Sequence, residues 1–144
     1  FWWKLGDSMS NLLVQNIKHT NNTTSMAIDS SGQVTIRGEG SATTTNLQQG
    51  LAKVWAHSAE NGASLDDNFN SSSITDLATG KQQINIANDM SNANYSVLCS
   101  YIDNQTDLTH WCDGLTTAKW QQNAYNSGAY IDRAFASVAF GDLA

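Results

Sequence analysis

The chain has 144 residues and no proline, although proline makes up about 5% of residues in average proteins. Proline lacks a backbone N–H and is confined to the edges of sheets, so no strand of this chain is interrupted by it. The turns must instead come from glycine, asparagine and aspartate, which tolerate the backbone conformations that tight turns need. The absence of proline therefore fits a chain of strands and turns.

Charge is also scarce. Only 14% of the residues are charged, against 40% hydrophobic residues, so the chain is expected to be globular with a surface made mainly of neutral amides and hydroxyls. That surface favours a β-rich protein. Seven basic residues face 13 acidic ones, and the net charge of -6 repels phosphate backbones and anionic lipids. Nucleic acid and membrane insertion are not expected.

Long apolar runs and export signals are missing as well. No segment approaches the roughly 20 apolar residues that span a bilayer, and no apolar stretch comes after a basic start. We therefore expect a soluble chain that is not exported by a signal peptide. The two cysteines, Cys99 and Cys112, are expected to be free thiols, and a disulfide that closes a small loop is the less favoured alternative.

The first residues, "FWWKLGDS", differ in composition from the rest of the chain, and "MSNLLVQNIKHT" from Met9 is typical of a natural start. The first eight residues are either a remnant of an upstream segment or an apolar plug for a neighbouring subunit. We predict an extended N-terminal assembly segment over residues 1–46 and a β-sandwich domain over residues 47–144. The predicted assembly residues are Phe1, Trp2, Trp3, Leu12, Leu13 and Ile17.

Alternation with a period of two residues recurs along the chain. A hairpin is predicted around "DSSG" and a strand over "GLAKVWAHS", and "KQQINIAN" places Ile84 and Ile86 on one face. "NANYSVLCSYID" and "AYIDRAFASVAFGD" give two later strands, with Val97 and Val138 among the expected core residues. Short strands between turns, without a long amphipathic helix, predict an all-β fold, an antiparallel β-sandwich with jelly-roll-like connections.

Signals for catalysis or metal binding are weak. The sequence shows no nucleophile elbow, phosphate loop or dinucleotide fingerprint, and His110 with Cys112 offers only two of the four ligands of a structural zinc site. We predict no catalytic residue, no metal and no cofactor. The alternative is a polysaccharide-cleaving enzyme with two carboxylates in a groove. Its candidate carboxylates are Asp103, Asp107, Asp113 and Asp132.

Aromatic residues among amides and hydroxyls mark residues 104–128, which we predict to be a polar loop or irregular excursion. Trp111, Trp120 and Tyr125, with Tyr130 just beyond, have the composition of a sugar-binding surface, where flat rings stack and amides bond hydroxyls. We predict Trp111, Trp120 and Tyr125 as ligand-binding residues. The alternative is that these rings fill the core.

One long stretch, "DDNFNSSSITDLATGKQQINIANDMSNANYSV", preceded by "KVWAHS" and followed at the end by "SVAFGD", resembles a domain of tail-fibre and other virion structural proteins of tailed bacteriophages, especially of marine bacteria. The resemblance covers most of residues 47–102 and the last strand. It departs from the family's pattern at "DLATGK", which lacks a second acidic residue, and at "INIAN", which lacks an aromatic one. The matching positions are Trp55, Phe69, Asn70, Ser72 to Asp76, Gly80, Ile84, Met90, Asn92 to Val97 and Phe140 to Asp142.

The resemblance implies a structural role and transfers no catalytic residue. Members of the family are β-sandwich modules, commonly trimeric, displayed on a fibre, tail or capsid. The chain is accordingly expected in a virion that assembles in the bacterial cytoplasm, as a self-associating fibre or appendage module that contacts other virion proteins and a host-surface glycan. A capsid or tube decoration subunit with contacts only to other subunits is the second expectation.

Overall fold

The computed structural model describes residues 15–37, 44–102 and 108–144. It divides into two compact units, Phe1–Gln48 and Gln49–Ala144, whereas the sequence analysis sets the boundary between residues 46 and 47. No described helix is long and apolar enough to cross a bilayer. Several residues named above lie outside the described part: Phe1, Trp2, Trp3, Leu12, Leu13, Asp103 and Asp107.

The first unit is a small antiparallel sheet with strands in the order β1-β2-β3-β4. Its strands are β1 (Asn16–Lys18), β2 (Thr24–Ile28), β3 (Val34–Arg37) and β4 (Thr44–Asn46). The short helix α1 (Leu47–Gly50) follows and spans the boundary between the units. The predicted "DSSG" hairpin joins β2 to β3, where the Gly32 amide donates to the Asp29 carbonyl at 3.0 Å. The described part of the predicted N-terminal segment thus includes the predicted hairpin as the middle of a four-stranded sheet.

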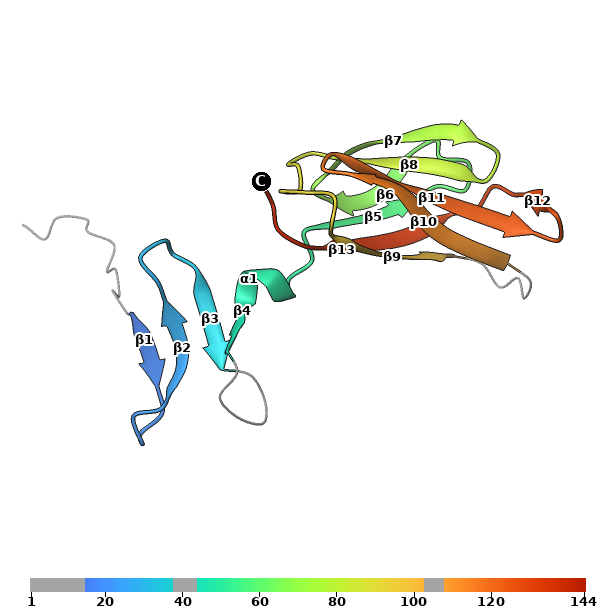
Figure 1. Cartoon of the computed structure of the whole chain (residues 1–144). Coiled ribbons are helices and arrows are strands. Elements are labelled where there is room, and N and C mark those ends of the chain that lie inside the picture. Colours follow the sequence, from blue (N-terminus) through green and yellow to red (C-terminus); the bar gives the residue numbers. More distant parts are fainter. Residues whose placement is uncertain (1–14, 38–43, 103–107) are drawn as a thin grey trace, which may run out of the picture. The chain divides into compact units, whose positions relative to one another are not determined.

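The second unit is an antiparallel sandwich of two packed sheets, as predicted (Figure 1). The β5 sheet has the order β6-β5-β13-β9, and the β11 sheet has the order β10-β11-β8-β7 with β12 paired to β11. The strands of the β5 sheet are β5 (Val54–Ser58), β6 (Leu65–Phe69), β9 (Ser96–Tyr101) and β13 (Phe135–Phe140). Those of the β11 sheet are β7 (Ser71–Ala78), β8 (Lys81–Ile86), β10 (Leu108–Thr116), β11 (Lys119–Asn126) and β12 (Ala129–Tyr130).

The connections differ from the jelly-roll-like pattern that we predicted. Three hairpins, β5–β6, β7–β8 and β10–β11, each stay within one sheet instead of bridging the two sheets. The chain changes sheet between these hairpins, and β13 returns to pair with both β5 and β9. Periodicity identifies strands and their faces, but strand order depends on contacts between distant segments, which periodicity does not encode.

The core lies between the sheets and follows the predicted alternation in β5 and β8. Val54 and Ala56 of β5 are buried, as are Ile84 and Ile86 of β8. In β13 the inward residues are Phe135, Ser137 and Ala139, so the prediction of Val138 as a core residue is wrong. The buried cluster comprises Val54, Ala56, Ile84, Ile86, Met90, Tyr95, Trp120 and Ala139.

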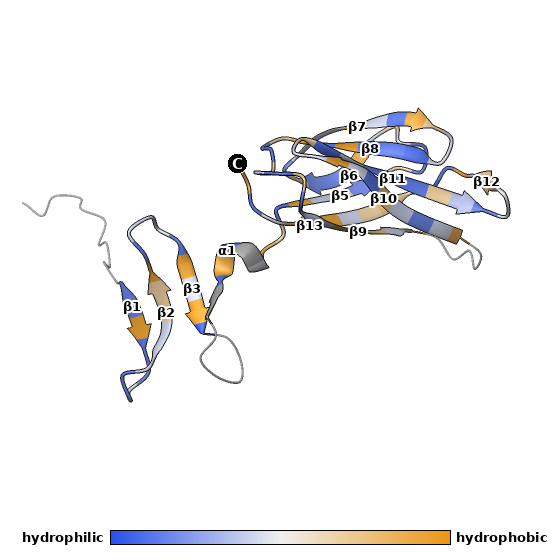
Figure 2. Cartoon of the chain, viewed as in Figure 1, coloured by the Kyte–Doolittle hydropathy of each residue, from blue (hydrophilic) through white to orange (hydrophobic). Residues whose placement is uncertain are grey.

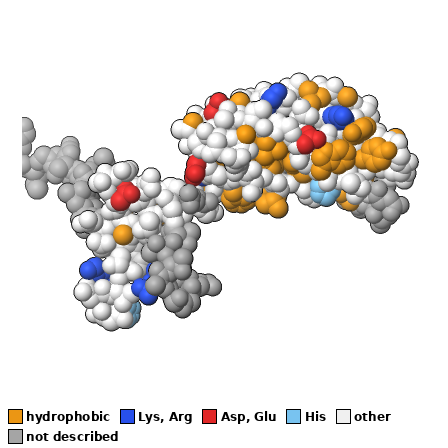
Figure 3. Space-filling view, in the orientation of Figure 1, with side chains coloured by type: hydrophobic (Ala, Val, Ile, Leu, Met, Phe, Trp, Pro, Cys, Tyr) orange, Lys and Arg blue, Asp and Glu red, His pale blue; other side chains and the backbone are white. Residues whose placement is uncertain are grey.

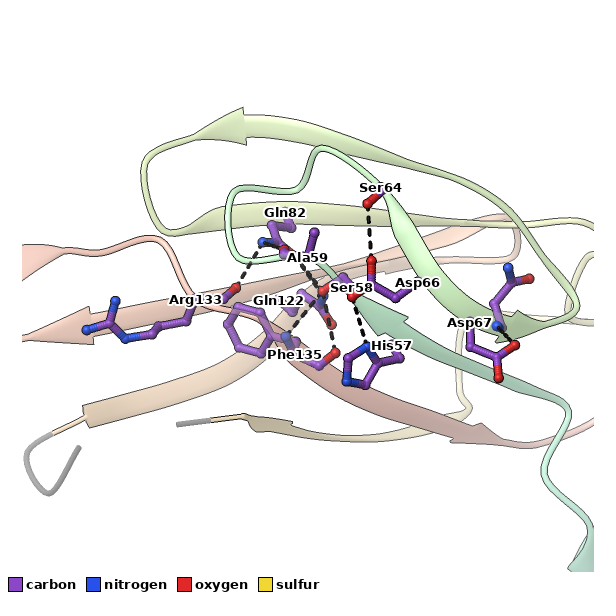
Figure 4. Close-up of polar contacts among 11 residues, drawn as sticks. His57, Ser58, Ala59, Ser64, Asp66, Asp67, Gln82, Gln122, Arg133 and Phe135 are labelled. Carbon is purple, nitrogen blue, oxygen red and sulfur yellow. Dashed lines mark hydrogen bonds and ion pairs between the residues drawn. The ribbon is translucent and has the colours of Figure 1, made fainter. Parts of the chain in front are cut away.

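A buried polar network also joins the two sheets (Figure 4). The Ser58 hydroxyl of β5 donates to Gln82 Oε1 of β8 at 2.8 Å, and Gln122 Nε2 of β11 donates to Ser58 Oγ and to Gln82 Oε1, each at 3.1 Å. Gln82 Nε2 in turn donates to the carbonyls of Ala59, Glu60 and Arg133 at 3.0 Å. Because buried amides and hydroxyls are costly when unpaired, this network favours one relative placement of the sheets.

The turn between β7 and β8 requires a glycine. Gly80 has a φ of 69°, and a Cβ atom there would lie 2.7 Å from both the Ala124 carbonyl oxygen and the Ile131 nitrogen. The Gly80 amide donates to Asp132 Oδ1 at 2.6 Å. Asp132, a candidate catalytic carboxylate, therefore holds this turn against the β11–β13 connection.

Candidate functional site

The predicted loop over residues 104–128 is wrong for the residues that the structure describes. They form the β10–β11 hairpin, in which His110 pairs with Ala124 and Cys112 with Gln122. The pattern is hard to read because the inward side of β11 includes the buried amide Gln122, which belongs to the inter-sheet network. Figure 2 shows long hydrophilic stretches along β8 and β11, although both are inner strands of the β11 sheet.

The three predicted ligand-binding rings fall on different sides of this sheet. Trp120 is 0% exposed and packs in the core, so its prediction as a binding residue is wrong. Trp111 and Tyr125 have the opposite parity and lie half-buried on the outer face. The structure thus separates Trp120 from the two rings with which the sequence grouped it.

Trp111 and Tyr125 belong to an aromatic cluster on the outer face, made of Trp111, Tyr125, Tyr130 and Lys81. The ring centroids of Trp111 and Tyr130 are 6.1 Å apart, and those of Tyr125 and Tyr130 are 5.3 Å apart in an edge-to-face arrangement. Lys81 Nζ lies 4.4 Å from the centroid of the Tyr130 ring, within the range of a cation–π contact. Figure 3 shows hydrophobic side chains gathered over the part of the sandwich where β10, β11 and β12 lie.

A row of polar side chains crosses all four strands beside the cluster. Register places Asp113, Gln121, Gln83 and Thr75 side by side on the outer face. The row touches the cluster because the Trp111 indole N–H donates to Asp113 Oδ2 at 2.9 Å. A second polar group continues it, since Gln83 Nε2 donates to Asn85 Oδ1 at 2.7 Å.

Asn123 lies in the register position between Trp111 and Lys81, at the base of the aromatic cluster. It is 2% exposed, and its Nδ2 has no hydrogen-bond partner among the described residues. A buried amide without a partner is uncommon in folded proteins. Asn123 Nδ2 is thus a buried donor in the register position next to the aromatic cluster.

The outer face of the β11 sheet thus combines rings, amides, hydroxyls and the cations of Lys81 and Lys119 over a paired sheet surface. Rings supply stacking area, and fixed amides supply donors and acceptors. We call the surface formed by the cluster and the row together the aromatic–amide face. Sequence reasoning missed Lys81, whose role depends on the β8–β11 register, and it considered Asp113 only as a catalytic carboxylate.

The outer face of the β5 sheet is different. One residue from each strand forms a row across the whole sheet: Phe69, Trp55, Val138 and Leu98. Phe69 and Leu98 are 53% and 61% exposed, although both are apolar. A groove of about 630 Å³ runs over this face, with His57 and Asp67 beside the row. His57 Nδ1 lies 3.3 Å from Asp66 Oδ2 (Figure 4).

The structure gives little support to the other candidate sites. No group of three or more potential metal ligands occurs within residues 15–37, 44–102 and 108–144. His110 and Cys112 both face inward on β10, where the His110 ring contacts Tyr101 edge-on at 5.2 Å. Ile17, the one predicted assembly residue that is described, lies on β1 and is exposed.

Comparison of the chain with protein-family models, with curated protein sequences and with solved structures yields no match in any of the three.

Proposed function

We propose that the chain is a non-enzymatic module of a bacteriophage fibre or appendage, and that it attaches to host-surface glycans through the aromatic–amide face. The observation that carries the glycan part is the contact of Trp111 with Tyr130 and Asp113, which joins an aromatic cluster to a row of amides. The virion part rests on the resemblance of residues 47–102 and the last strand to tail-fibre domains. The virion as location and a homotrimer or other repeated assembly as state are part of the same proposal.

The chemistry of this face suits a sugar. A pyranose ring presents an apolar C–H surface that stacks on an aromatic ring, and hydroxyls at its rim that need donors and acceptors. The cluster offers the first, and Gln121, Gln83 and Asp113 offer the second within neighbouring register positions. Because hydrogen bonds hold Trp111 and the amides in place before binding, little side-chain entropy is lost on binding.

The experiment screens the full chain against an array of bacterial capsular polysaccharides and lipopolysaccharides, then titrates the oligosaccharide that binds best. Trp111→Ala and Tyr125→Ala should each weaken binding at least ~10-fold, which corresponds to about 1.4 kcal/mol. Trp55→Ala, on the outer face of the β5 sheet, is the matched control and should bind as the parent does. Equal loss in Trp55→Ala, or no loss in either test variant, would contradict the proposal.

A second candidate function is supported by the apolar row on the β5 sheet. An exposed row of Phe69, Trp55, Val138 and Leu98 is typical of a surface that another subunit covers. It favours a capsid or tube decoration subunit that binds only its neighbours. Absence of binding to any polysaccharide, together with association through this face, would support this second candidate over the first.

A further inference from the structure

The two cysteines meet where the edges of the two sheets face each other. Cys99 is on β9 of the β5 sheet and Cys112 is on β10 of the β11 sheet, and both half-buried side chains face inward between the two sheets. The next inward pair on the same strands, Tyr101 and His110, is in contact, with ring centroids 5.2 Å apart. Cys99 lies two residues before Tyr101 on β9, and Cys112 lies two residues after His110 on β10, so the two thiols are neighbours of this ring contact if the strands run antiparallel across this edge.

The two thiols differ in their surroundings. Both residues are half-buried, and Cys112 packs against the core cluster. The hydrogen bond from the Cys112 thiol lowers the pKa of Cys99, because it stabilises the Cys99 thiolate. The same bond raises the pKa of Cys112, and burial and the nearby charges of Cys99 and Asp113 raise it further. Cys99 is therefore the thiol prepared for nucleophilic attack, and Cys112 is its proton-bearing partner.

We propose that Cys99 and Cys112 form a redox-active pair, which a small-molecule disulfide such as oxidised glutathione converts into a disulfide that links the two sheets. The structure describes both as free thiols, in agreement with the sequence expectation for a reducing cytosol. The pair is independent of the proposed glycan binding, since both side chains face inward, away from the aromatic–amide face.

The exchange proceeds in two balanced steps. The Cys99 thiolate attacks one sulfur of oxidised glutathione, the glutathione S–S bond breaks, and a glutathione thiolate leaves and takes up a proton. Cys112 then loses its proton to solvent, its thiolate attacks the Cys99 sulfur, and the second glutathione leaves. Two cysteine thiols lose two electrons in total, and one glutathione disulfide becomes two glutathione thiols.

The product would connect the edge strands β9 and β10 of the two sheets by a covalent bond. The bond closes a loop with 12 residues between the two cysteines, and such a cross-link restricts the unfolded chain. Each cysteine lies two residues along its strand from the Tyr101–His110 contact, so this contact holds the two strands side by side before the disulfide forms. We expect oxidation to raise the melting temperature by roughly 10 °C, as for a loop of this size in a domain of about 100 residues.

The test exposes the full chain to oxidised glutathione, blocks remaining thiols with N-ethylmaleimide, and measures the intact mass and the melting temperature. The expected product has lost two hydrogen atoms, carries no blocked thiol, melts higher, and returns to the parent state with dithiothreitol. Cys112→Ser should instead stop at one glutathione on Cys99. Cys99→Ser should react far more slowly at Cys112.

Three results would overturn the proposal. The first is a parent chain that keeps two blockable thiols under conditions in which Cys112→Ser becomes glutathionylated. The second is glutathione on both cysteines without an internal bond. The third is a disulfide-linked dimer on a non-reducing gel in place of the internal disulfide.

Discussion

The two outer faces of the sandwich are built on the same plan and carry opposite chemistry. Each presents an antiparallel surface, of five strands in the β11 sheet and four in the β5 sheet, with a tryptophan among its outward residues, Trp111 and Trp55 respectively. The Trp111 indole donates a hydrogen bond to the Asp113 carboxylate, and amides and tyrosines surround the ring. Trp55, in contrast, lies in a row of aliphatic and aromatic neighbours. The neighbours in register, and not the ring itself, thus distinguish the polar aromatic face from the apolar face.

Trp120 adds a third environment and the largest expected effect. It is fully buried, so Trp120→Ala should lower the free energy of unfolding by about 3–5 kcal/mol, through lost burial and the cavity that remains. Trp111→Ala, on the half-exposed face, should cost about 1 kcal/mol or less. Urea denaturation followed by circular dichroism measures both. Similar losses in the two variants would mean that Trp111 is a core residue and that the aromatic–amide face is misassigned.

The contrast between Trp111 and Trp120 also shows how far the sequence could predict the fold. Alternation predicted strands at β5 and β8 and placed Ile84 and Ile86 on one face of β8, because the buried sides of these strands are apolar apart from Ser58 and Gln82. It failed in β11, where Gln122 is buried and therefore breaks the apolar pattern. A buried amide is explained only by its partners, and these come from positions 58 and 82, far away in the sequence.

The candidate site was predictable in its composition and not in its membership. Aromatic residues among amides pointed to residues 104–128, and Trp111 and Tyr125 from this stretch lie together on one outer face. Lys81 comes from a separate hairpin, and only the β8–β11 register brings it to Tyr130. Val138 was expected in the core of the last strand, yet the buried residues of β13 are Phe135, Ser137 and Ala139, and the parity of the strand places Val138 outward.

The next largest effect concerns the apolar face. Leu98→Lys places a charge at one end of the exposed row, where covering by another subunit would require its desolvation. We expect self-association measured by sedimentation velocity to weaken at least ~10-fold, and polysaccharide binding to remain unchanged. Leu77→Lys on β7 is the matched control, since Leu77 is 43% exposed and lies outside the row. Equal weakening in both variants would assign the effect to net charge and not to this face.

A smaller effect should appear at alkaline pH, and it tests how the β10–β11 hairpin is held. The Tyr95 hydroxyl lies 2.9 Å from the Thr116 carbonyl and 2.8 Å from the Lys119 carbonyl, at the turn of this hairpin. Burial, followed by the charge of Cys112, raises the pKa of Tyr95 from 10.0 to about 12. The folded state thus keeps the hydroxyl proton more tightly than the unfolded state does.

The sign of the pH dependence is set by this difference. The contribution of Tyr95 is fully present below pH 10 and is lost as the pH rises towards 12, since the unfolded chain releases the proton first. Tyr95→Phe should cost about 1 kcal/mol at neutral pH, from the lost hydrogen bond, and should show a shallower decline between pH 10 and 12. Urea midpoints of the parent and the variant across this range provide the measurement. Parallel curves would show that Tyr95 does not titrate in this way.

The smallest effect separates charge from shape within the aromatic cluster. Lys81→Met keeps an unbranched apolar side chain against the Tyr130 ring but removes the ammonium group that lies 4.4 Å from the ring centroid. An exposed cation–π contact contributes about 0.5–1 kcal/mol, so oligosaccharide affinity should fall roughly two- to five-fold if the contact orients Tyr130 for binding. Lys119→Met is the control, because Lys119 lies on the same face two rows away, opposite Asn85.

Titration calorimetry in low and high salt then separates two origins of the loss of oligosaccharide affinity. A ring-orientation effect persists in high salt and is specific to Lys81, whereas a general attraction for anionic sugars disappears in high salt and is shared by both lysines. Loss in neither variant would mean that the face binds through its rings and amides without help from its cations.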